Sequence, residues 1–260
     1  MEFLKKDLAP ITAKAWNEIE ERAKSILINT LSGRRIVKVT SPKGRACEGI
    51  FTGKMALKQK DDLFYGIYKV QPMIETRITF VLSRWELDNI ERGAKDINFN
   101  PLDEAIKKAA KFEEEAIFYG LDEACIEGLK STAHPIISLG ESSEEIVVNI
   151  IKAIAMLRNS TAKPPYTLVV SPEKWQHLNI VSKDVEFIEK IEKILGSKII
   201  VSPSICEAFL LPYNDENFEL SLGIDYSIGY QHSDSTNVTL FITSSFTFTV
   251  HDKTQVIMFK

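Results

Sequence analysis

Apolar residues recur every three or four positions between residues 11 and 31, which predicts an amphipathic helix. The repeating positions are Trp16, Ile19, Ala23, Ile26 and Thr30. Thr12 can cap the start of this helix, and Gly33 follows its end. In the last turns, apolar side chains spread over more than one face; these are Ile26, Leu27, Ile28 and Leu31. Burial inside the same domain and a groove for a partner both explain such a second apolar face.

A long hairpin is predicted within the mainly extended residues 34–82. Apolar and aromatic runs at residues 50–57 and 63–68 flank a polar tip, Gln59-Lys60-Asp61-Asp62. A hairpin of two strands buries too little apolar surface to be stable alone in water. We therefore expect it to lie on a neighbouring surface, with another subunit as one candidate.

A second helix is predicted over residues 101–119. Asn100 is its expected cap, and Gly120 follows its end. The apolar stripe consists of Leu102, Ile106, Ala109, Phe112 and Ala116. We expect Asp103 and Lys107, which are four residues apart, to pair on the solvated side of this helix.

From residue 142 onwards, helical and extended patterns alternate, which suggests an α/β layer with a small central sheet. The expected order is a helix from Ser142 or Ser143 to Arg158, a strand over 166–170, helices over 172–178 and 185–195, and a strand over 198–201. Residues 218–222 return to extended structure. The strand over 238–250 is the longest, and at about 3.3 Å per residue it would span roughly 40 Å. A strand of that length suits an elongated subunit better than a compact enzyme core.

The length, composition and charge of the chain limit the kinds of protein that it can be. The 260 residues allow one large domain or two intimately packed ones, and 44% hydrophobic with 26% charged residues is ordinary for a soluble globular protein. The net charge of -4, spread along the chain, argues against a nucleic-acid binder that relies on phosphate neutralisation. The N-terminal residues lack an apolar signal core, and no apolar run is long enough to span a membrane. The cysteines are odd in number and far apart, which is typical of reduced thiols; they are Cys47, Cys125 and Cys206. We therefore expect a cytoplasmic protein with no membrane and no specific nucleic acid among its partners.

Motifs for catalysis are missing from the sequence. It has no phosphate-binding loop, no dinucleotide glycine fingerprint and no Gly-x-Ser-x-Gly elbow, and its four histidines lack ligand-type spacing. We expect no catalytic residues, no metal site and no required cofactor. A tryptophan, Trp85, stands between Arg84 and Glu86, where it either packs in a core or interface or stacks a flat ligand.

Several short blocks, in order along the whole chain, resemble the shell proteins of encapsulins, which are protein nanocompartments of the linocin-type bacteriocin family. The blocks are residues 1–6, 85–93, 165–169, 227–230, 240–243 and 246–248. The resemblance implies an α+β fold, that of the tailed-phage major capsid proteins, with a peripheral domain, an axial domain and an extended hairpin loop. It also implies that many copies assemble into a closed icosahedral shell that is structural and not an enzyme.

On this resemblance the chain divides into five parts. Residues 1–47 hold the N-terminal helix and the start of the peripheral domain, 48–70 the extended loop, 71–139 the peripheral domain, about 140–225 the axial domain, and 226–260 the return to the peripheral domain. The loops of the axial domain would gather at the symmetry axes of the shell, and the long final strand would cross back through the peripheral domain.

The resemblance also implies that cargo enzymes dock on the inner wall through a short C-terminal targeting tail. By position, the candidate cargo-peptide-binding residues are Leu27, Leu31, Arg34, Ile36, Ile228 and Tyr230. The apolar members would accept aliphatic side chains, and Arg34 could hold a carboxylate or a carbonyl. Lys38 stands at a place that is acidic in some relatives, so the tail that this chain prefers could differ.

Some relatives bind flavin near the tryptophan that matches Trp85, so flavin is the candidate cofactor and Trp85 its candidate stacking residue. The cargo implied by the resemblance is a ferritin-like protein or a dye-decolourising peroxidase. Iron storage or oxidative-stress defence would then be the work of the cargo, and the shell would contribute confinement and pores.

Three other interpretations remain open. A phage or prophage major capsid protein shares the fold, but we expect it to carry a long acidic or coiled N-terminal extension. A secreted bacteriocin or protease would need a signal peptide and a catalytic motif. A soluble flavin-dependent enzyme would be yellow and form small oligomers, whereas the shell interpretation predicts large particles whatever their colour.

Overall fold

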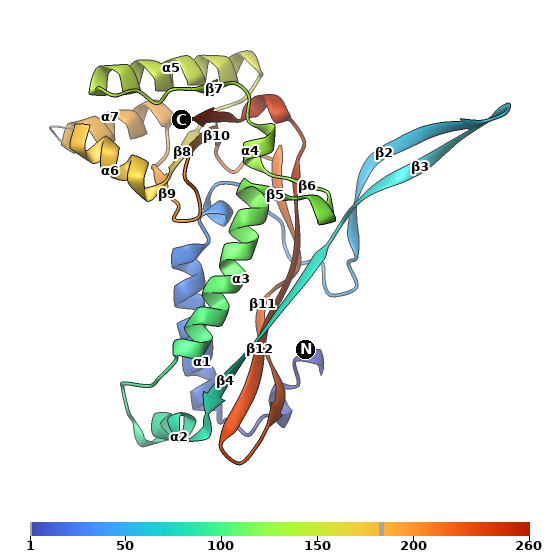
Figure 1. Cartoon of the computed structure of the whole chain (residues 1–260), viewed down its shortest axis with the longest axis vertical. Helices are drawn as coiled ribbons and strands as arrows, with labels where there is room; N and C mark the ends of the chain where they lie inside the picture. The colour runs from blue at the N-terminus through green and yellow to red at the C-terminus, as the bar shows by residue number, and fades with distance from the viewer. Residues whose placement is uncertain (1, 182–184) are drawn as a thin grey trace. The chain divides into compact units, whose positions relative to one another are not determined.

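The computed structural model describes residues 2–181 and 185–260 (Figure 1). Its α-helices are α1 (Ala13–Thr30), α2 (Arg84–Arg92), α3 (Asn100–Phe118), α4 (Leu129–Thr132), α5 (Ser143–Asn159), α6 (Pro172–Val181) and α7 (Val185–Leu195). The strands are β1 (Lys38–Val39), β2 (Gly49–Lys60), β3 (Leu63–Pro72), β4 (Ile74–Ser83), β5 (Gly120–Leu121), β6 (Ile126–Glu127), β7 (Ile136–Ile137), β8 (Tyr166–Val170), β9 (Ile200–Val201), β10 (Ala208–Pro212), β11 (Phe218–Ser233), β12 (Asn237–Val250) and β13 (Ile257–Phe259). Short 3-10 helices are η1 (Glu2–Leu4), η2 (Lys6–Leu8), η3 (Gly33–Arg35), η4 (Asp122–Ala124) and η5 (Lys253–Gln255).

The chain divides into two compact units, and β11, β12 and α3 run from one into the other. The first unit comprises Met1–Leu31, Ser41–Glu113 and Ser221–Thr247. The second unit comprises Ser32–Thr40, Glu114–Leu220 and Phe248–Lys260. It takes in residues 114–139 and 248–260, which the resemblance assigns to the peripheral domain, and the expected domain boundaries stay a prediction.

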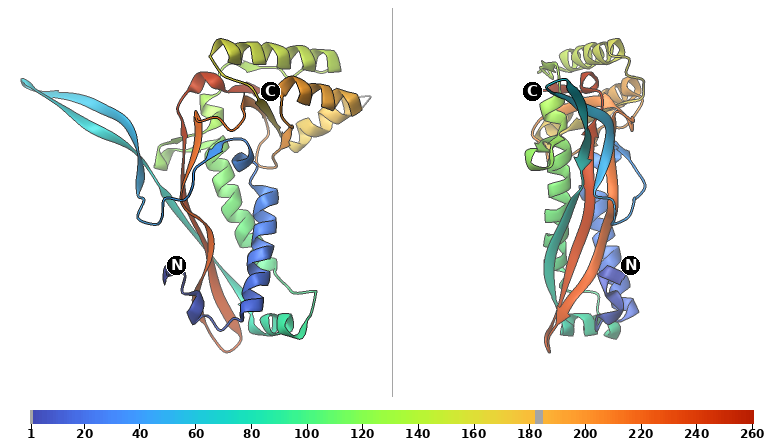
Figure 2. Two further views of the ribbon diagram at one scale, coloured as in Figure 1. Left: turned by 180° about the vertical axis from the view of Figure 1, so that it is seen from behind. Right: turned by 90° about the vertical axis from the view of Figure 1, so that its right-hand side faces the viewer.

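Two helices packed on a sheet form the first unit. α1 and the first part of α3 lie side by side on one face of β4, β11 and β12 (Figure 2). β12 pairs antiparallel with β4, from Asn237 opposite Ser83 to Phe246 opposite Ile74. One buried cluster joins these elements, and it includes Ala15, Ile19, Ala23, Leu102, Ile106, Ala109, Ile228, Leu240 and Ile242. The apolar faces predicted for both helices are therefore the faces that they bury, and the long final strand is confirmed.

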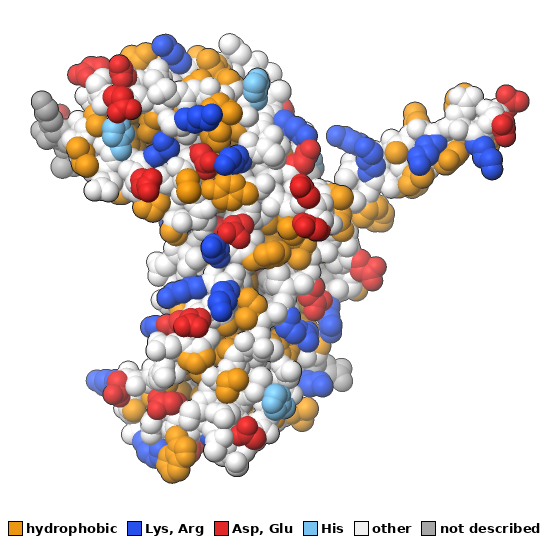
Figure 3. All heavy atoms as spheres, viewed as in Figure 1, with side chains coloured by type: hydrophobic (Ala, Val, Ile, Leu, Met, Phe, Trp, Pro, Cys, Tyr) orange, Lys and Arg blue, Asp and Glu red, His pale blue; other side chains and the backbone are white. Residues whose placement is uncertain are grey.

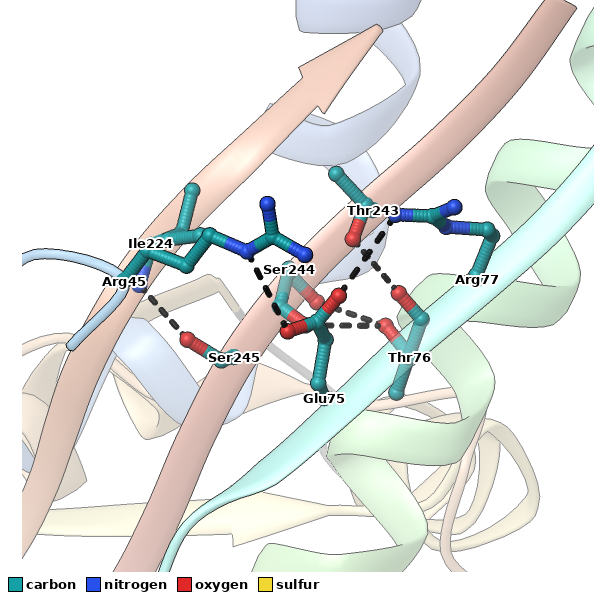
Figure 4. A network of polar contacts seen from close by, with 8 residues as sticks. All are labelled: Arg45, Glu75, Thr76, Arg77, Ile224, Thr243, Ser244 and Ser245. Atoms are coloured by element: carbon teal, nitrogen blue, oxygen red, sulfur yellow. Dashed lines mark hydrogen bonds and ion pairs between the residues drawn. The ribbon is translucent and has the colours of Figure 1, made fainter. Parts of the chain in front are cut away.

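Polar contacts tie β4 to β12 within the first unit (Figure 4). The Thr243 hydroxyl donates to the Thr76 carbonyl at 2.8 Å, and the hydroxyls of Thr76 and Ser244 lie 2.9 Å apart. At the sheet surface, Glu75 and Arg77 form an ion pair at 3.6 Å. A slip of one residue would separate the hydroxyls from their partners and leave them unsatisfied in a buried sheet. These contacts therefore fix the register of β4, the strand that follows the hairpin.

The second unit is built around a five-stranded sheet in the order β7-β13-β10-β8-β9. Every residue of β8 is buried. Helices α5, α6 and α7 cover the sheet through Ile146, Ile150, Leu157, Leu178, Ile191 and Leu195. The Ser142 hydroxyl accepts a hydrogen bond from the Glu145 amide at 3.3 Å, so it caps α5 as predicted. The alternating helices and strands expected from residue 142 onwards are confirmed.

A carboxylate, a lysine and a tyrosine form a charged cluster in the second unit. Lys130 Nζ lies 2.6 Å from the Glu207 carboxylate, and the Tyr119 hydroxyl donates to the same carboxylate at 3.2 Å. Burial opposes the ionisation of Glu207, but Lys130 and then Tyr119 more than offset it, so the pKa of Glu207 is lowered. Burial is also the main cause that raises the pKa of Tyr119 to about 12, and the charge of Glu207 adds to it. Tyr119 therefore remains a donor at neutral pH.

Some elements differ from the prediction. Helix α2 was not predicted from the sequence, and it forms because Leu87 and Ile90 are buried and Gly93, at φ 89°, provides a left-handed end. β11 extends to Ser233, beyond its predicted end at residue 222, because it pairs with the long strand β12. β9 is shorter than predicted, and β10 and β13 were not predicted. These short strands depend on partners that are distant in sequence.

Two polar residues of α3 also differ from the prediction. Asn100 is the first helical residue and not the cap, and its amide donates to the Asn98 side chain at 3.1 Å. Asp103 is buried and does not lie on the solvated side. Arg22 Nε donates to its carboxylate at 2.9 Å, and this hydrogen bond is the main cause that raises the pKa of Arg22. The pair joins α1 to α3.

Replacing Phe246 with alanine tests the packing of β12. The Phe246 ring is fully buried and lies edge-on to the Phe112 ring at 6.2 Å. The Phe246→Ala variant should lower the free energy of unfolding by about 3–5 kcal/mol because a cavity replaces the ring. Urea titration followed by tryptophan fluorescence measures this difference. Ile28→Ala, at a side chain that is 61% exposed, should change it by less than about 0.5 kcal/mol. Equal effects of the two substitutions would contradict this packing.

Acid titration tests the Glu207 cluster. Because the pKa of Glu207 is lowered in the folded chain, its charge stabilises the fold above its ordinary pKa of 4.5, and this contribution is lost as pH falls through the folded pKa. The melting temperature of the Glu207→Gln variant should lie below that of the wild type at pH 7, and the gap should narrow below about pH 4.5. The exposed Glu216 serves as the matched control, since Glu216→Gln should leave the wild-type profile unchanged. A gap that stays constant down to pH 3 would refute the charge effect.

Candidate functional site

The hairpin of β2 and β3, which we call the arm, presents apolar side chains to solvent. Its strands pair antiparallel from Gly49 opposite Pro72 to Lys60 opposite Leu63, which confirms the predicted hairpin. Figure 3 shows hydrophobic side chains along the arm and acidic ones at its tip. The large apolar side chains are 41–81% exposed, and they are Phe51, Met55, Leu57, Leu63, Phe64, Tyr65, Ile67, Tyr68 and Val70.

One face of the arm is almost entirely apolar. Met55 lies opposite Tyr68, Leu57 opposite Gly66, and Gln59 opposite Phe64. Residues that are opposite each other, or two apart along a strand, point to the same face. Met55, Leu57, Phe64 and Tyr68 therefore share a face, and no described residue of the chain covers it. Contiguous exposed apolar surface of this kind marks an interaction site.

Three of the six cargo-binding candidates lie in the first unit around one cluster. Leu27, at the end of α1, and Tyr230, on β11, are partly buried against it, and Ile228 is a buried member of it. The Tyr230 hydroxyl lies 2.9 Å from the Ser233 hydroxyl. The structure therefore brings the end of α1 and β11 together within this unit. Leu27 and Tyr230 keep part of their surface accessible, and Ile228 does not.

The other three candidates lie around the end of α1 and the segment that follows it. Leu31 is buried in the first unit, and Ile36 is fully buried in the second, where its carbonyl accepts a bond from the Asn214 amide at 2.8 Å. Arg34 is partly exposed. The side chains of Leu31, Ile36 and Ile228 thus fill the subunit's own interior. The assignment of the six residues to a cargo tail stays a prediction, and Leu27, Arg34 and Tyr230 are the members with accessible surface.

A hollow of about 460 Å³ lies beside Arg34 in the second unit. Its lining residues are Arg34, Arg35, Val37, Lys38, Val39, Ile200, Tyr213 and Asn214. Of these, the sequence singled out Arg34 and Lys38. Arg35 is next to Arg34 in the sequence but was not singled out. The approach of Tyr213 and Ile200 could not be found from sequence spacing, because both residues are far from Lys38 along the chain.

The turn that carries the arginines is held from inside the second unit. The Gly33 amide donates to the Glu114 carboxylate at 2.7 Å, and the hydroxyls of Ser32 and Ser202 are hydrogen-bonded at 2.7 Å. A Cβ at Gly33 would lie 2.7 Å from the Ile117 Cδ1 atom, so a larger residue here would displace the Ile117 side chain of α3. Buried hydrogen bonds and tight packing therefore position the short helix η3 (Gly33–Arg35).

Trp85 lies on the surface of α2 with 69% of its side chain exposed. The Arg92 guanidinium lies 5.6 Å from the centre of its ring. The interpretation of Trp85 as a core residue is therefore wrong, because α2 turns Leu87 and Ile90 inward instead. Contact with another molecule and stacking of a flat ligand both suit an exposed indole. Flavin binding at Trp85 stays a prediction.

Across residues 2–181 and 185–260, no three His, Cys, Asp or Glu side chains are grouped so that they could hold a metal ion. In the same part of the chain, no helix has the length and apolar character needed to cross a membrane.

The chain is similar along most of its length to proteins of one family. The family profile described as "Encapsulating protein for peroxidase" matches residues 1–247. A type 1 encapsulin shell protein of Rhodococcus erythropolis is 35% identical over 261 residues, which cover 99% of each chain. A type 1 encapsulin shell protein of Mycolicibacterium paratuberculosis is 34% identical over 252 residues, which cover 95% of each chain.

Solved structures resemble the fold at much lower sequence identity. The virus-like particle of Pyrococcus furiosus has a TM-score of 0.65 at 16% identity, over 92% of this chain and 98% of the other. The capsid protein of Myoviridae phage XM1 has a TM-score of 0.57 at 10% identity, over 86% and 88% of the two chains. At these identities the likeness establishes the fold alone. It confirms the predicted α+β fold of the tailed-phage major capsid proteins.

Proposed function

The chain belongs to the encapsulin shell-protein family, and we propose that its copies enclose cargo enzymes that carry a C-terminal targeting peptide. As a member of this family it is a structural shell subunit that assembles with copies of itself into a nanocompartment. The compartment would be cytoplasmic. The proposed cargo is a ferritin-like protein or a dye-decolourising peroxidase, so the compartment would serve iron storage or oxidative-stress defence.

The arm is the observation that supports assembly most directly. Two strands without a third element beneath them cannot hold their own fold firmly in water. The four large side chains on its apolar face lose contact with water only when a second molecule covers them. A neighbouring copy of the chain is present at every position of a closed shell, so it supplies this cover without a further partner.

Cargo docking is supported by the end of α1. Within the first unit, Leu27 and Tyr230 present partly buried apolar surface, and the Tyr230 side chain adds a hydroxyl. Such a surface suits an extended peptide that inserts aliphatic side chains and is oriented by its polar groups. The family description names a peroxidase as the enclosed protein, in agreement with one of the two proposed cargoes.

A phage or prophage capsid protein is the alternative function. The likeness to the capsid of phage XM1 shows the shared fold and does not distinguish the two functions. The family profile over residues 1–247 and the 34–35% identity to encapsulin shell proteins favour a nanocompartment that holds protein and not DNA. The nucleic-acid content of purified particles separates the two.

Substitutions on the apolar face of the arm should prevent particle formation. Leu57→Asp and Phe64→Asp each place a carboxylate where a neighbouring subunit must cover the arm, and desolvating it would cost several kcal/mol. We expect the wild type to form large closed particles and these variants to remain small oligomers, as measured by size-exclusion chromatography and negative-stain electron microscopy. Lys58→Asp adds a carboxylate to the opposite face and should retain particles. Normal particles from both face variants would contradict the assembly role of the arm.

A carboxylate at Leu27 should reduce cargo loading without preventing assembly. Leu27→Asp removes an aliphatic contact and places a charge in the proposed docking surface, so we expect roughly tenfold less cargo per shell. The shell is co-expressed with the product of the neighbouring gene, and the ratio of cargo to shell is measured by gel densitometry of purified particles. Ser25→Asp, on the exposed side of α1, should load normally. Equal loading of the Leu27 variant and the wild type would refute the role of Leu27.

A further inference from the structure

One edge of β4 has no strand beside it among the described residues. β4 is the last strand in the order β1-β11-β12-β4, and it runs for ten residues. In an antiparallel pair, a strand turns the backbone groups of alternate residues toward its partner. The Arg84 amide continues the β4–β12 register and donates to the Thr236 carbonyl at 2.9 Å, so β4 uses its even-numbered residues to bond β12. The amides and carbonyls of the odd-numbered residues, from Glu75 to Ser83, therefore point to the open edge.

The same edge is occupied farther back along the chain, in the arm. β3 runs into β4 as one continuous ribbon (Figure 1). Between the two strands, the Met73 amide donates to the Glu48 carbonyl at 3.0 Å. Met73 is odd-numbered, so β2 pairs with the edge that becomes open along β4. This pairing stops where β2 begins, at Gly49.

The open edge is charged in its first half and apolar in its second. Glu75 and Arg77 form an ion pair at 3.6 Å, and charges of this kind discourage unspecific pairing at a strand edge. Thr79 is exposed, and Val81 is apolar with 44% of its side chain exposed. The edge therefore suits a strand that brings apolar side chains next to Val81.

We infer that β3 in the arm of a second copy pairs with this edge. The inference rests on the proposed function, in which a neighbouring copy covers the arm. β3 has an open edge of its own, because its odd-numbered residues bond β2 and Phe64, Gly66 and Tyr68 turn their backbone groups the other way. β2 is less suitable, since its ladder is interrupted between Phe51 and Met55.

The side chains agree with this pairing. Residues that are opposite each other in adjacent strands point to the same face. Phe64 and Tyr68 belong to the apolar face of the arm, and pairing through their backbone groups places them beside Thr79 or Val81. Ladder hydrogen bonds then supply affinity, and the apolar contacts with Val81 select the register. Pairing of β4 with β4 of a second copy would leave the apolar face of the arm without a role.

Hydrogen–deuterium exchange of assembled wild-type particles, resolved to single amides by mass spectrometry, tests the inference. Among the described residues, no strand offers an acceptor to the amides of Arg77, Thr79 and Val81. In the particle we expect these amides, and those of Gly66 and Tyr68, to exchange at least about 100-fold more slowly than in an unstructured peptide.

A proline at Thr79 provides an independent test. Thr79→Pro removes a donor from the open edge and keeps the hydrogen bonds to β12, because the Thr79 amide points away from β12. Thr79→Ala keeps the amide and is the matched control. We expect roughly tenfold fewer particles from Thr79→Pro than from Thr79→Ala, as measured by size-exclusion chromatography. Circular dichroism shows whether both variants fold, and if Thr79→Pro does not, the exchange rates of the wild type decide.

Three results would overturn the inference. The first is exchange of the Arg77, Thr79 and Val81 amides at the rate of an unstructured peptide. The second is equal assembly of the two folded Thr79 variants. The third is protection along β4 without protection of Gly66 and Tyr68, which would assign a different strand to the edge. Wild-type particles still form in each case, so the proposed function stands; if the wild type forms no particles, the proposed function itself fails.

Discussion

Water must be kept from the apolar face of the arm, and this requirement governs the rest of the molecule. Within residues 2–181 and 185–260, no element forms a layer beneath Met55, Leu57, Phe64 and Tyr68. We propose that another copy of the chain covers this face, because a second molecule can bury these side chains. The arm continues into β4, which pairs with the long strand β12. The hydrogen bond from the Thr243 hydroxyl to the Thr76 carbonyl helps to fix the register of this pair. A rigid base is what allows an extended hairpin to reach a defined place on a neighbour.

Elements with a strong period could be predicted from the sequence. The helical face of Ile19 and Ala23 belongs to this group, because its period repeats often enough to identify its buried face. The alternation of residues 238–250 likewise predicted a long strand, although the middle of β12 is buried on both faces. Helix α2 could not be predicted in this way, since only two of its residues turn into the core. Strands β10 and β13 depend on pairing between segments that are distant in sequence, which no local pattern records.

The candidate residues could be named from the sequence, but which of them keep accessible surface could not. The apolar character of Leu31, Ile36 and Ile228 identifies residues that avoid water, but it does not tell a groove for a partner from the interior of the subunit. Trp85 illustrates the converse, since a large aromatic residue lies exposed on a short polar helix. The positive charge at Lys38 was visible in the sequence, and its position near Ile200 and Tyr213 required the structure.

The charged residues of the arm also matter before any shell exists. A newly made subunit exposes two β-strands rich in leucine, phenylalanine and tyrosine, which is the composition that drives disordered aggregation. Lys54, Lys58 and Lys60 interrupt the first strand, and Asp61 and Asp62 occupy the tip. Charges in these positions act as gatekeepers: they repel the edge-to-edge stacking of identical arms and leave the apolar face available to the correct neighbour. The same hairpin thus carries both the apolar face that requires a partner and the charged residues that limit aggregation before assembly.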